Sequence, residues 1–231
     1  MTYLFDGVAE ALRLVVIGDP EVLHAAWVSL TCTLTAVSLA AVIAVPWGAW
    51  LGLYRPRTHG VQVFFLRLGM SMPTVLIGLL VFGLLSRQGL LGSLDLLYTR
   101  TAIITGEVLL AVPLIGSLAH GLAAGLDRRV VDTALTLGAS RPAALRKVLG
   151  EVRPGLAAIT LAAFGRCFTE LGIAITVGGS LRLSTRTLAS TIQLELSRGE
   201  LARALAPGLI LLAVAAAAAV AVQRLSKESH A

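Results

Sequence analysis

Long apolar runs separated by short charged stretches dominate this chain of 231 residues. A helix needs roughly 20 apolar residues to cross a hydrocarbon layer about 30 Å thick, and about five runs reach that length. They cover residues 23–46, 61–86, 101–125, 155–179 and 204–222. The pattern therefore predicts an all-α integral membrane protein with about five transmembrane helices.

Three segments fall outside these runs. Residues 1–21 carry apolar side chains at helical spacing among charges, which predicts an amphipathic helix lying on the membrane surface. Residues 224–231 are a short basic tail that follows a transmembrane domain at 22–223. Residues 180–203 are more polar, and their apolar stretch at 188–196 either dips back into the membrane or packs laterally.

Composition excludes a soluble domain, because 56% of the residues are hydrophobic, 14% are charged and the mean hydropathy is +0.85. The formal charge of +6 does not indicate nucleic-acid binding, since the basic residues cluster in loops beside apolar runs without interleaved aromatic residues. Cys32 and Cys167 each lie within a predicted span. We expect them to pack as small apolar residues, without a disulfide or metal framework.

A charged island interrupts the apolar pattern after the third run. Residues 127–153 hold six of the nineteen Lys and Arg residues. Val130–Leu137 combines good helix formers with apolar residues at helical spacing, and Gly138 supplies the backbone freedom that ends or bends a helix. Ser140 can cap a second helix, and the first turn of that helix tolerates Pro142.

The island is therefore expected to form two short helices around a Gly-Ala-Ser elbow. Such a compact knob could fit a groove on a partner protein. The composition is explained equally well by an ordinary basic cytoplasmic loop, which is helical only because Ala and Leu favour helix.

Five spans place the two termini on opposite sides of the membrane. If the island is cytoplasmic, the inner segments at 54–60, 127–153 and 224–231 hold ten Lys and Arg residues, against seven in the outer segments. Because cytoplasmic loops carry an excess of Lys and Arg, this distribution predicts an external N-terminus and a cytoplasmic C-terminus.

Four ionisable residues lie inside predicted spans: Arg67, Glu107, Arg166 and Glu170. Each is costly against lipid, so each is expected to face a partner group or a water-lined cavity. Arg166 and Glu170 are four residues apart on one helix face and can pair directly. The four residues are candidates for a translocation pathway, or else they join helices structurally. Arg67 could also snorkel to the inner surface.

The sequence offers no catalytic or metal-binding constellation. Its four histidines are scattered without paired ligand spacing. Its two lysines, Lys147 and Lys227, lie outside any G-x-x-x-x-G-K-[ST] phosphate loop. We therefore expect no metal or cofactor in this chain. If the chain takes part in ATP-driven transport, another polypeptide must bind and hydrolyse the ATP.

One set of residues in the island carries a family resemblance. It comprises Asp132, Thr133, Ala134, Leu137, Gly138, Ala139 and Ser140, with Arg141 directly after them. The segment resembles the Glu-Ala-Ala…Gly loop of ABC-importer permeases, the cytoplasmic element that docks the ATPase subunit. Two details depart from the family pattern. Asp132 stands in place of Glu, and the usual Leu-Pro is displaced, since Gly150 and Glu151 precede Pro154.

The resemblance extends to further regions. Ser71–Gly92 looks like the second-span region of permeases for molybdate, tungstate and sulfate, and Gly165–Gly179 looks like their Gly-Arg…Glu-x-Gly core-span motif. The Pro-Glu-Val at 20–22 and the Glu-Leu-Ser-Arg-Gly at 195–199 are most similar to tungstate-type permeases. The likeness covers most of residues 20–222.

The resemblance implies a type I ABC-importer permease architecture with the island as the coupling helix. Such permeases work as two identical subunits in the lipid of a prokaryotic cytoplasmic membrane. Two ATPase subunits bind ATP and Mg²⁺, and an extracytoplasmic binding protein delivers the substrate. The implied function is inward movement of an oxyanion, tungstate first and molybdate next, by alternating access. Arg166 would contribute positive potential to the path, and Glu170 would hold it in place.

Three alternatives stay open. Within the importer class, the cargo could be sulfate or another small solute. A non-transporting membrane scaffold could use the same island to bind a cytoplasmic partner. An intramembrane enzyme is disfavoured, because a nucleophile, a general base and a metal site are all missing from the sequence.

Overall fold

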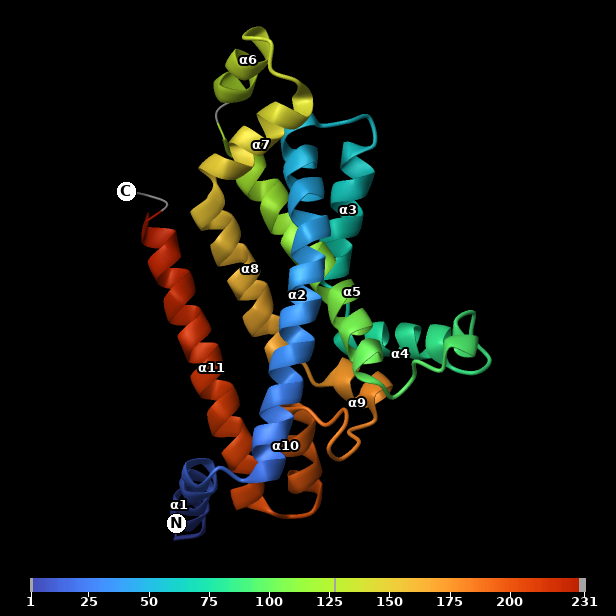
Figure 1. Cartoon of the computed structure of the whole chain (residues 1–231), viewed down its shortest axis with the longest axis vertical. Coiled ribbons are helices and arrows are strands. Elements are labelled where there is room, and N and C mark those ends of the chain that lie inside the picture. The colour runs from blue at the N-terminus through green and yellow to red at the C-terminus, as the bar shows by residue number, and fades with distance from the viewer. Residues whose placement is uncertain (1, 127, 229–231) are drawn as a thin grey trace. The chain divides into compact units, whose positions relative to one another are not determined.

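The computed structural model describes residues 2–126 and 128–228, apart from the side chains of residues 2–6, 128, 130, 134 and 226–228. The regular structure in these ranges is helical (Figure 1), which confirms the predicted all-α class. The elements are α1 (Thr2–Ile17), α2 (Pro20–Tyr54), α3 (His59–Met70), α4 (Thr74–Leu85), the 3₁₀ turn η1 (Gly92–Leu94), α5 (Arg100–Ala124), α6 (Arg128–Thr136), α7 (Arg141–Glu151), α8 (Arg153–Phe168), α9 (Gly172–Gly178), α10 (Leu188–Ser197) and α11 (Leu201–Glu228).

The capacity to cross a membrane lies in a subset of these helices. Within the described ranges, α2, α5 and residues 201–225 of α11 are each long and apolar enough to span a bilayer. Counting the bent pairs α3–α4 and α7–α8 as one span each raises the number to five. The chain is therefore an integral membrane protein with three to five candidate spans.

The second predicted span is broken at its proline. α3 ends at Met70 and α4 begins at Thr74, and the two helix axes differ by 102°. Pro73 lies at the break with φ −59° and ψ 129°. This extended conformation, together with the missing N–H of proline, prevents a continuous helix. The expected kink is therefore a sharp turn between two separate helices.

The fourth predicted span also consists of two helices. α8 ends at Phe168 and α9 begins at Gly172. Glu170 lies in the gap, where its Oε1 accepts hydrogen bonds from the main-chain N–H groups of Gly172 (2.8 Å) and Ile173 (3.4 Å). A side-chain acceptor in this position satisfies the free N–H groups that begin a helix, so Glu170 explains why α9 starts here.

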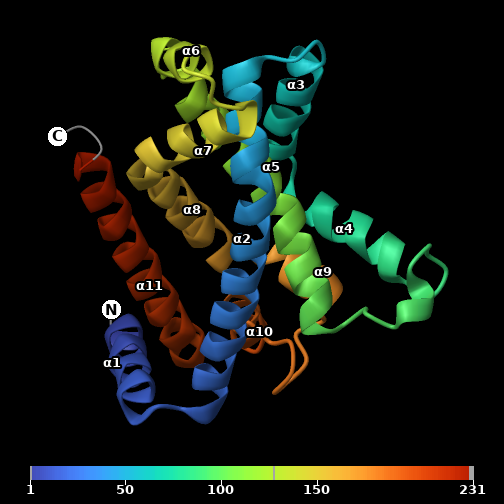
Figure 2. The ribbon, with the colours of Figure 1, turned by 45° about the horizontal axis from the view of Figure 1, so that its top comes forward.

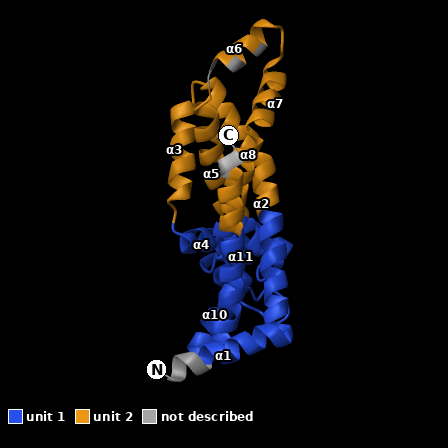
Figure 3. Cartoon of the chain, turned by 90° about the vertical axis from the view of Figure 1, so that its left-hand side faces the viewer, with its two compact units in different colours: residues 1–36, 73–107, 165–217 blue, residues 37–72, 108–164, 218–231 orange. Residues whose placement is uncertain are grey.

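The chain divides into two compact units, coloured in Figure 3. Unit 1 comprises residues 1–36, 73–107 and 165–217. Within it, α10 is tied to α2, because the main-chain N–H of Leu188 donates a hydrogen bond to Ser29 Oγ (2.9 Å). Leu188 and Ala189 are buried. The start of the apolar stretch at 188–196 thus packs against α2, whereas Leu196 near its end is exposed.

α1 lies beside the first turns of α11 within unit 1 (Figure 2). Gly7 of α1 faces the side chains of Leu201 and Leu205. Apolar side chains elsewhere on α1 are exposed, including Leu12 and Val16. A helix with one packed face and exposed apolar side chains suits the predicted place at a membrane surface, which stays a prediction.

Unit 2 comprises residues 37–72, 108–164 and 218–231. The second half of α2 approaches α5 closely, with Gly48 against the main-chain carbonyl of Gly116 and Gly52 against that of His120. A Cβ atom at Gly52 would lie 2.7 Å from the His120 oxygen, closer than packing allows. Small residues four apart let two helix backbones meet in this way. Here the meeting is within one chain.

Candidate functional site

The elbow between α6 and α7 has the order that the sequence predicts. α6 ends at Thr136, and Gly138 adopts φ +86°, a left-handed conformation that glycine accommodates without strain. Ser140 is the N-cap of α7, where its Oγ accepts a hydrogen bond from the N–H of Ala143 at 3.4 Å. Pro142 lies in the first turn of α7. The predicted helix, glycine, cap and second helix are confirmed.

Most residues predicted to dock a partner are accessible at this elbow. Leu137 is 82% exposed at the outer edge of the turn. The other exposed members are Asp132, Thr133, Gly138, Ser140 and Arg141. Ala139 is half-buried, and the side chain of Ala134 lies outside the described residues.

Tyr54 anchors the elbow to the end of α2. Its hydroxyl donates a hydrogen bond of 2.8 Å to the main-chain carbonyl oxygen of Arg141. The guanidinium carbon of Arg141 lies 5.6 Å from the centroid of the Tyr54 ring, a cation–π distance. The last residue of α2 is therefore joined to the first residue of α7 by a hydrogen bond and a ring contact.

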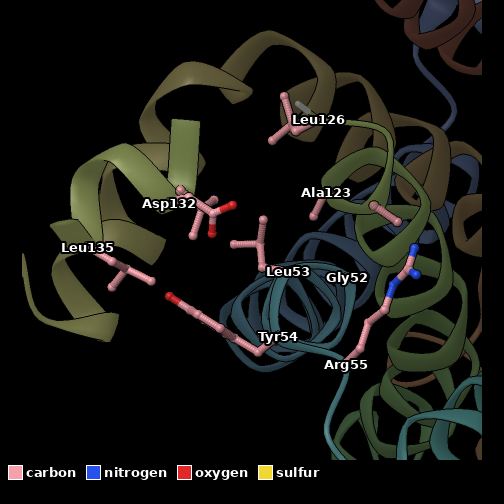
Figure 4. Close-up of a pocket in the computed structure, with 10 residues that line it drawn as sticks. Gly52, Leu53, Tyr54, Arg55, Ala123, Leu126, Asp132 and Leu135 are labelled. Atoms are coloured by element: carbon pink, nitrogen blue, oxygen red, sulfur yellow. The ribbon is translucent and has the colours of Figure 1, made fainter. Parts of the chain in front are cut away.

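A cavity of about 490 Å³ lies behind the elbow, between α6 and the ends of α2 and α5 (Figure 4). Leu53 and Tyr54 of α2, Ala124 of α5, and Asp132 and Leu135 of α6 are among the residues that line it. Figure 4 shows the Asp132 carboxylate pointing into this space. Arg55 lines the same cavity, so its walls combine aliphatic side chains with polar and charged groups.

The predicted pairing of Arg166 with Glu170 is present. Arg166 Nη1 donates to Glu170 Oε2 at 2.8 Å. The Glu170 side chain is 4% exposed, whereas the Arg166 side chain is 46% exposed. Glu170 thus uses one oxygen to cap α9 and the other to hold Arg166. The arginine is oriented by a buried, fully engaged carboxylate while much of its guanidinium stays open.

The other two ionisable candidates, Glu107 and Arg67, do not join the Arg166–Glu170 pair. Glu107 is 3% exposed, and its Oε1 accepts a long hydrogen bond of 3.5 Å from Thr33 Oγ1. Its Oε2 has no hydrogen-bond partner among the described residues. Arg67 is exposed on α3 and belongs to unit 2, whereas Glu107, Arg166 and Glu170 belong to unit 1. The structure therefore joins one pair of the four candidates directly.

Comparison with known proteins identifies the family of this chain. The family model described as binding-protein-dependent transport system inner membrane component matches residues 44–228. The chain belongs to this family. It is a multi-pass inner-membrane permease subunit of an ABC importer. Permeases of the family are non-catalytic membrane subunits, and ATP is hydrolysed by a separate ATPase. Membership also implies a binding protein that delivers the cargo.

Individual relatives resemble the permease over most of its length. The tungstate uptake system permease protein TupB of Peptoclostridium acidaminophilum is 32% identical over 228 residues, 99% of this chain and 100% of the relative. TupB of Campylobacter jejuni is 30% identical over 93% of this chain and 90% of its own. The molybdenum transport system permease protein ModB of Mycobacterium tuberculosis is 31% identical over 72% of this chain and 69% of its own.

Sequence reasoning missed side chains that hold unit 2 together. Tyr54 closes an apolar run, and nothing in its neighbours points to a residue 87 positions later. His59 and His120 also meet, with their Nε2 atoms 3.0 Å apart. The two histidines are 61 positions apart, so only the packing of α3 on α5 reveals them. Spacing along the sequence carries no signal for either contact.

Proposed function

We propose that this permease moves tungstate, with molybdate as the next candidate, into the cytoplasm by alternating access. It would act as one of two identical subunits, served by two ATPase subunits and an external binding protein. Tungstate is favoured because two tungstate permeases resemble the chain over at least nine-tenths of its length. Molybdate ranks next because the similarity to a molybdenum permease covers 72% of the chain.

The observation that carries the proposal is the elbow anchored by Tyr54. An ATPase that moves the elbow at Leu137–Arg141 would pull directly on the end of α2, through the Tyr54 hydrogen bond. α2 has 35 residues, which at 1.5 Å per residue is a rod of about 50 Å. A helix of this length reaches across the bilayer. Work done at the cytoplasmic elbow can therefore tilt a whole span.

The pair of Arg166 and Glu170 suits a path for an anion. The exposed part of Arg166 offers guanidinium N–H groups, which match oxyanions in charge and in geometry. Glu170 offsets much of that charge at 2.8 Å, so the pair attracts an anion only weakly. A weak site favours passage, because a conducting site must release its ion as well as bind it. Selectivity would then belong to the external binding protein.

The proposed topology places the elbow in the cytoplasm. The five predicted spans put the termini on opposite sides of the membrane. With the elbow inside, the C-terminus is cytoplasmic and the N-terminus external, and the Lys and Arg residues of the loops are biased inward.

Reconstitution tests the proposal. The permease, its cognate ATPase and the binding protein are placed in proteoliposomes, and ATP-dependent uptake of labelled tungstate, molybdate and sulfate is measured. We expect tungstate uptake that exceeds molybdate uptake, and ATP hydrolysis that rises when loaded binding protein is added. Sulfate uptake above both would reassign the cargo. A complex in which the binding protein does not stimulate hydrolysis would instead support the scaffold alternative.

A further inference from the structure

A groove of about 740 Å³ lies along α7 and at the first residue of α8. Its lining residues are exposed and belong to unit 2, and they are Ala143, Arg146, Lys147, Gly150, Glu151 and Arg153. Three of these residues are cations and one is an anion. Because the cations outnumber the anion by two, the groove attracts an anionic ligand.

The basic face of the groove follows from helical spacing along α7. Four of the lining residues lie at positions i, i+3, i+4 and i+7, which share one face of a helix: Ala143, Arg146, Lys147 and Gly150. Ala144 and Val148 lie on another face and are buried. Ala143 and Gly150 are about one turn before and one turn after the two cations. Their small side chains leave room for a bulky ligand to reach the charges.

The cations of the groove are not neutralised by the protein. Within the described part of the chain, the ion pairs involve other residues. Glu151 is four residues after Lys147, yet no ion pair joins the two among the described residues. Arg166 does pair with a carboxylate at the same spacing. The positive charge of the groove is therefore available to a ligand from outside the chain.

α7 is oriented to meet the membrane surface. It is bent by 74° from α8, and Figure 1 shows the sharp turn between the two helices. α8 lies in the fourth predicted span, and membrane helices are tilted by about 20° on average. α7 therefore runs closer to the membrane plane than to its normal. Arg153, which begins α8, lies where the chain enters the predicted span, at the depth of the lipid headgroups.

We propose that this groove binds the phosphate headgroup of an anionic phospholipid in the inner leaflet. Arg146 and Arg153 offer guanidinium N–H groups to the phosphate oxygens, and Lys147 adds a point charge. The positive end of the α8 dipole lies beside them. The bound lipid tethers α7 to the membrane next to the turn into α8. The inference goes beyond the proposed function and uses only its topology.

Position and charge favour a lipid over a free anion. Glu151 also lines the groove, and its repulsion is greater for a doubly charged oxyanion than for the single charge of a phosphodiester. The acyl chains hold the headgroup at the membrane surface, so the local concentration of the lipid is high and a modest attraction suffices. The cytoplasmic leaflet is rich in anionic lipids that attract basic segments. A phospholipid meets each of these conditions.

Lipid binding to the full-length permease tests the proposal. The permease in detergent micelles is titrated with short-chain phosphatidylglycerol, and native mass spectrometry counts the bound lipid. Arg146→Gln combined with Lys147→Gln should weaken binding at least tenfold, because each basic residue near an anionic surface adds to the attraction. Arg55→Gln combined with Arg57→Gln removes the same charge from exposed residues of a loop on the same predicted side, and should change binding less than twofold. Equal binding by the wild type and the groove variant would overturn the proposal, and so would equal weakening in the two variants.

A gain of binding covers the case in which the groove variant misfolds. Glu151→Gln removes the one carboxylate that lines the groove, so binding should tighten at least twofold, which misfolding cannot produce. Unchanged or weaker binding would contradict the proposal. Inorganic phosphate at the lipid concentration should not displace the lipid, and displacement would reassign the groove to a free anion. The assay contains no ATPase, binding protein or cargo, so its failure leaves the proposed function standing, and failed uptake leaves the lipid site standing.

Discussion

The Tyr54 hydroxyl donates a hydrogen bond of 2.8 Å to the main-chain carbonyl of Arg141, joining the end of α2 to the elbow that we propose docks the ATPase. The contact is made by a side chain on one partner and the backbone on the other. It therefore depends on Tyr54 alone, whatever residue occupies position 141. The link between force at the elbow and tilt of α2 can thus be tested by removing one oxygen atom.

Tyr54→Phe should loosen the elbow without unfolding the permease. A hydrogen bond contributes about 0.5–1.5 kcal/mol net, so local opening of the first turn of α7 should rise roughly fivefold. Hydrogen exchange of the amides at 141–145 measures this opening. Tyr98→Phe, in unit 1, is the matched control and should leave these amides unchanged. Unaltered exchange in Tyr54→Phe would mean that the bond does not hold the elbow.

The same Gly→Ala substitution at two positions separates the effect of backbone strain from the effect of an added methyl group. Gly138→Ala places a side chain at φ +86°, which costs about 1–2 kcal/mol, although no atom lies within 4 Å of the new Cβ. Gly150→Ala, in the helical part of α7, should instead stabilise by about 0.5–1 kcal/mol. We expect Gly138→Ala to reduce tungstate moved per ATP hydrolysed, and Gly150→Ala to preserve it. Equal coupling ratios would exclude the elbow as the transmission element.

The charge at Arg166 can be removed while the side-chain length is largely kept. Arg166→Gln should lower uptake at least tenfold, equivalent to about 1.4 kcal/mol, at unchanged membrane expression. Arg166→Lys keeps the charge but loses the planar fork, so uptake should be intermediate. Arg87→Gln, at an exposed loop arginine, is the control. Wild-type uptake in Arg166→Gln would remove the arginine from the pathway and leave it a structural partner of Glu170.

Glu107 is predicted to limit stability more than transport. Its Oε2 is buried without a partner in the described structure, and such a group costs about 1–3 kcal/mol. Glu107→Gln keeps the shape and removes the charge, so the thermal midpoint should stay the same or rise, with uptake within about twofold of wild type. Glu10→Gln, at an exposed ion pair, should change the midpoint little. Loss of uptake at an unchanged midpoint would place Glu107 in the pathway.

Local features of this permease could be predicted from sequence because their causes are local. Gly138, Ser140 and Pro142 specify the elbow through backbone conformation, capping and ring geometry, which depend on neighbouring residues only. The pairing of Arg166 with Glu170 follows from helical spacing of four. The membrane-protein class could be predicted for the same reason, because each apolar run is by itself long enough to cross the bilayer.

Tertiary features escaped prediction because their causes are distant in sequence. The prediction of a kink at Pro73 found the position but not the complete break, after which α4 packs against α9, an element far along the chain. The Tyr54–Arg141 hydrogen bond and the cavity beside α6 depend on how α2, α5 and the α6–α7 segment pack together. The spacing of apolar residues along the sequence does not indicate this packing. The break before α9 depends on the two hydrogen bonds of Glu170, which a reading of Glu170 as a simple ion-pair partner overlooked.

The sidedness of the elbow is the claim on which coupling depends, and one labelling experiment on Leu137→Cys and Leu90→Cys measures it. Leu137 is 82% exposed, and the native Cys32 and Cys167 are buried. Leu90 is 89% exposed and lies between the second and third predicted spans, which is external in the proposed topology. A membrane-impermeant maleimide is applied to right-side-out and to inside-out vesicles. We expect the Leu137→Cys variant to label only in inside-out vesicles and the Leu90→Cys variant only in right-side-out ones. Labelling of the Leu137→Cys variant from the outside would contradict it, because no ATPase could then reach the elbow.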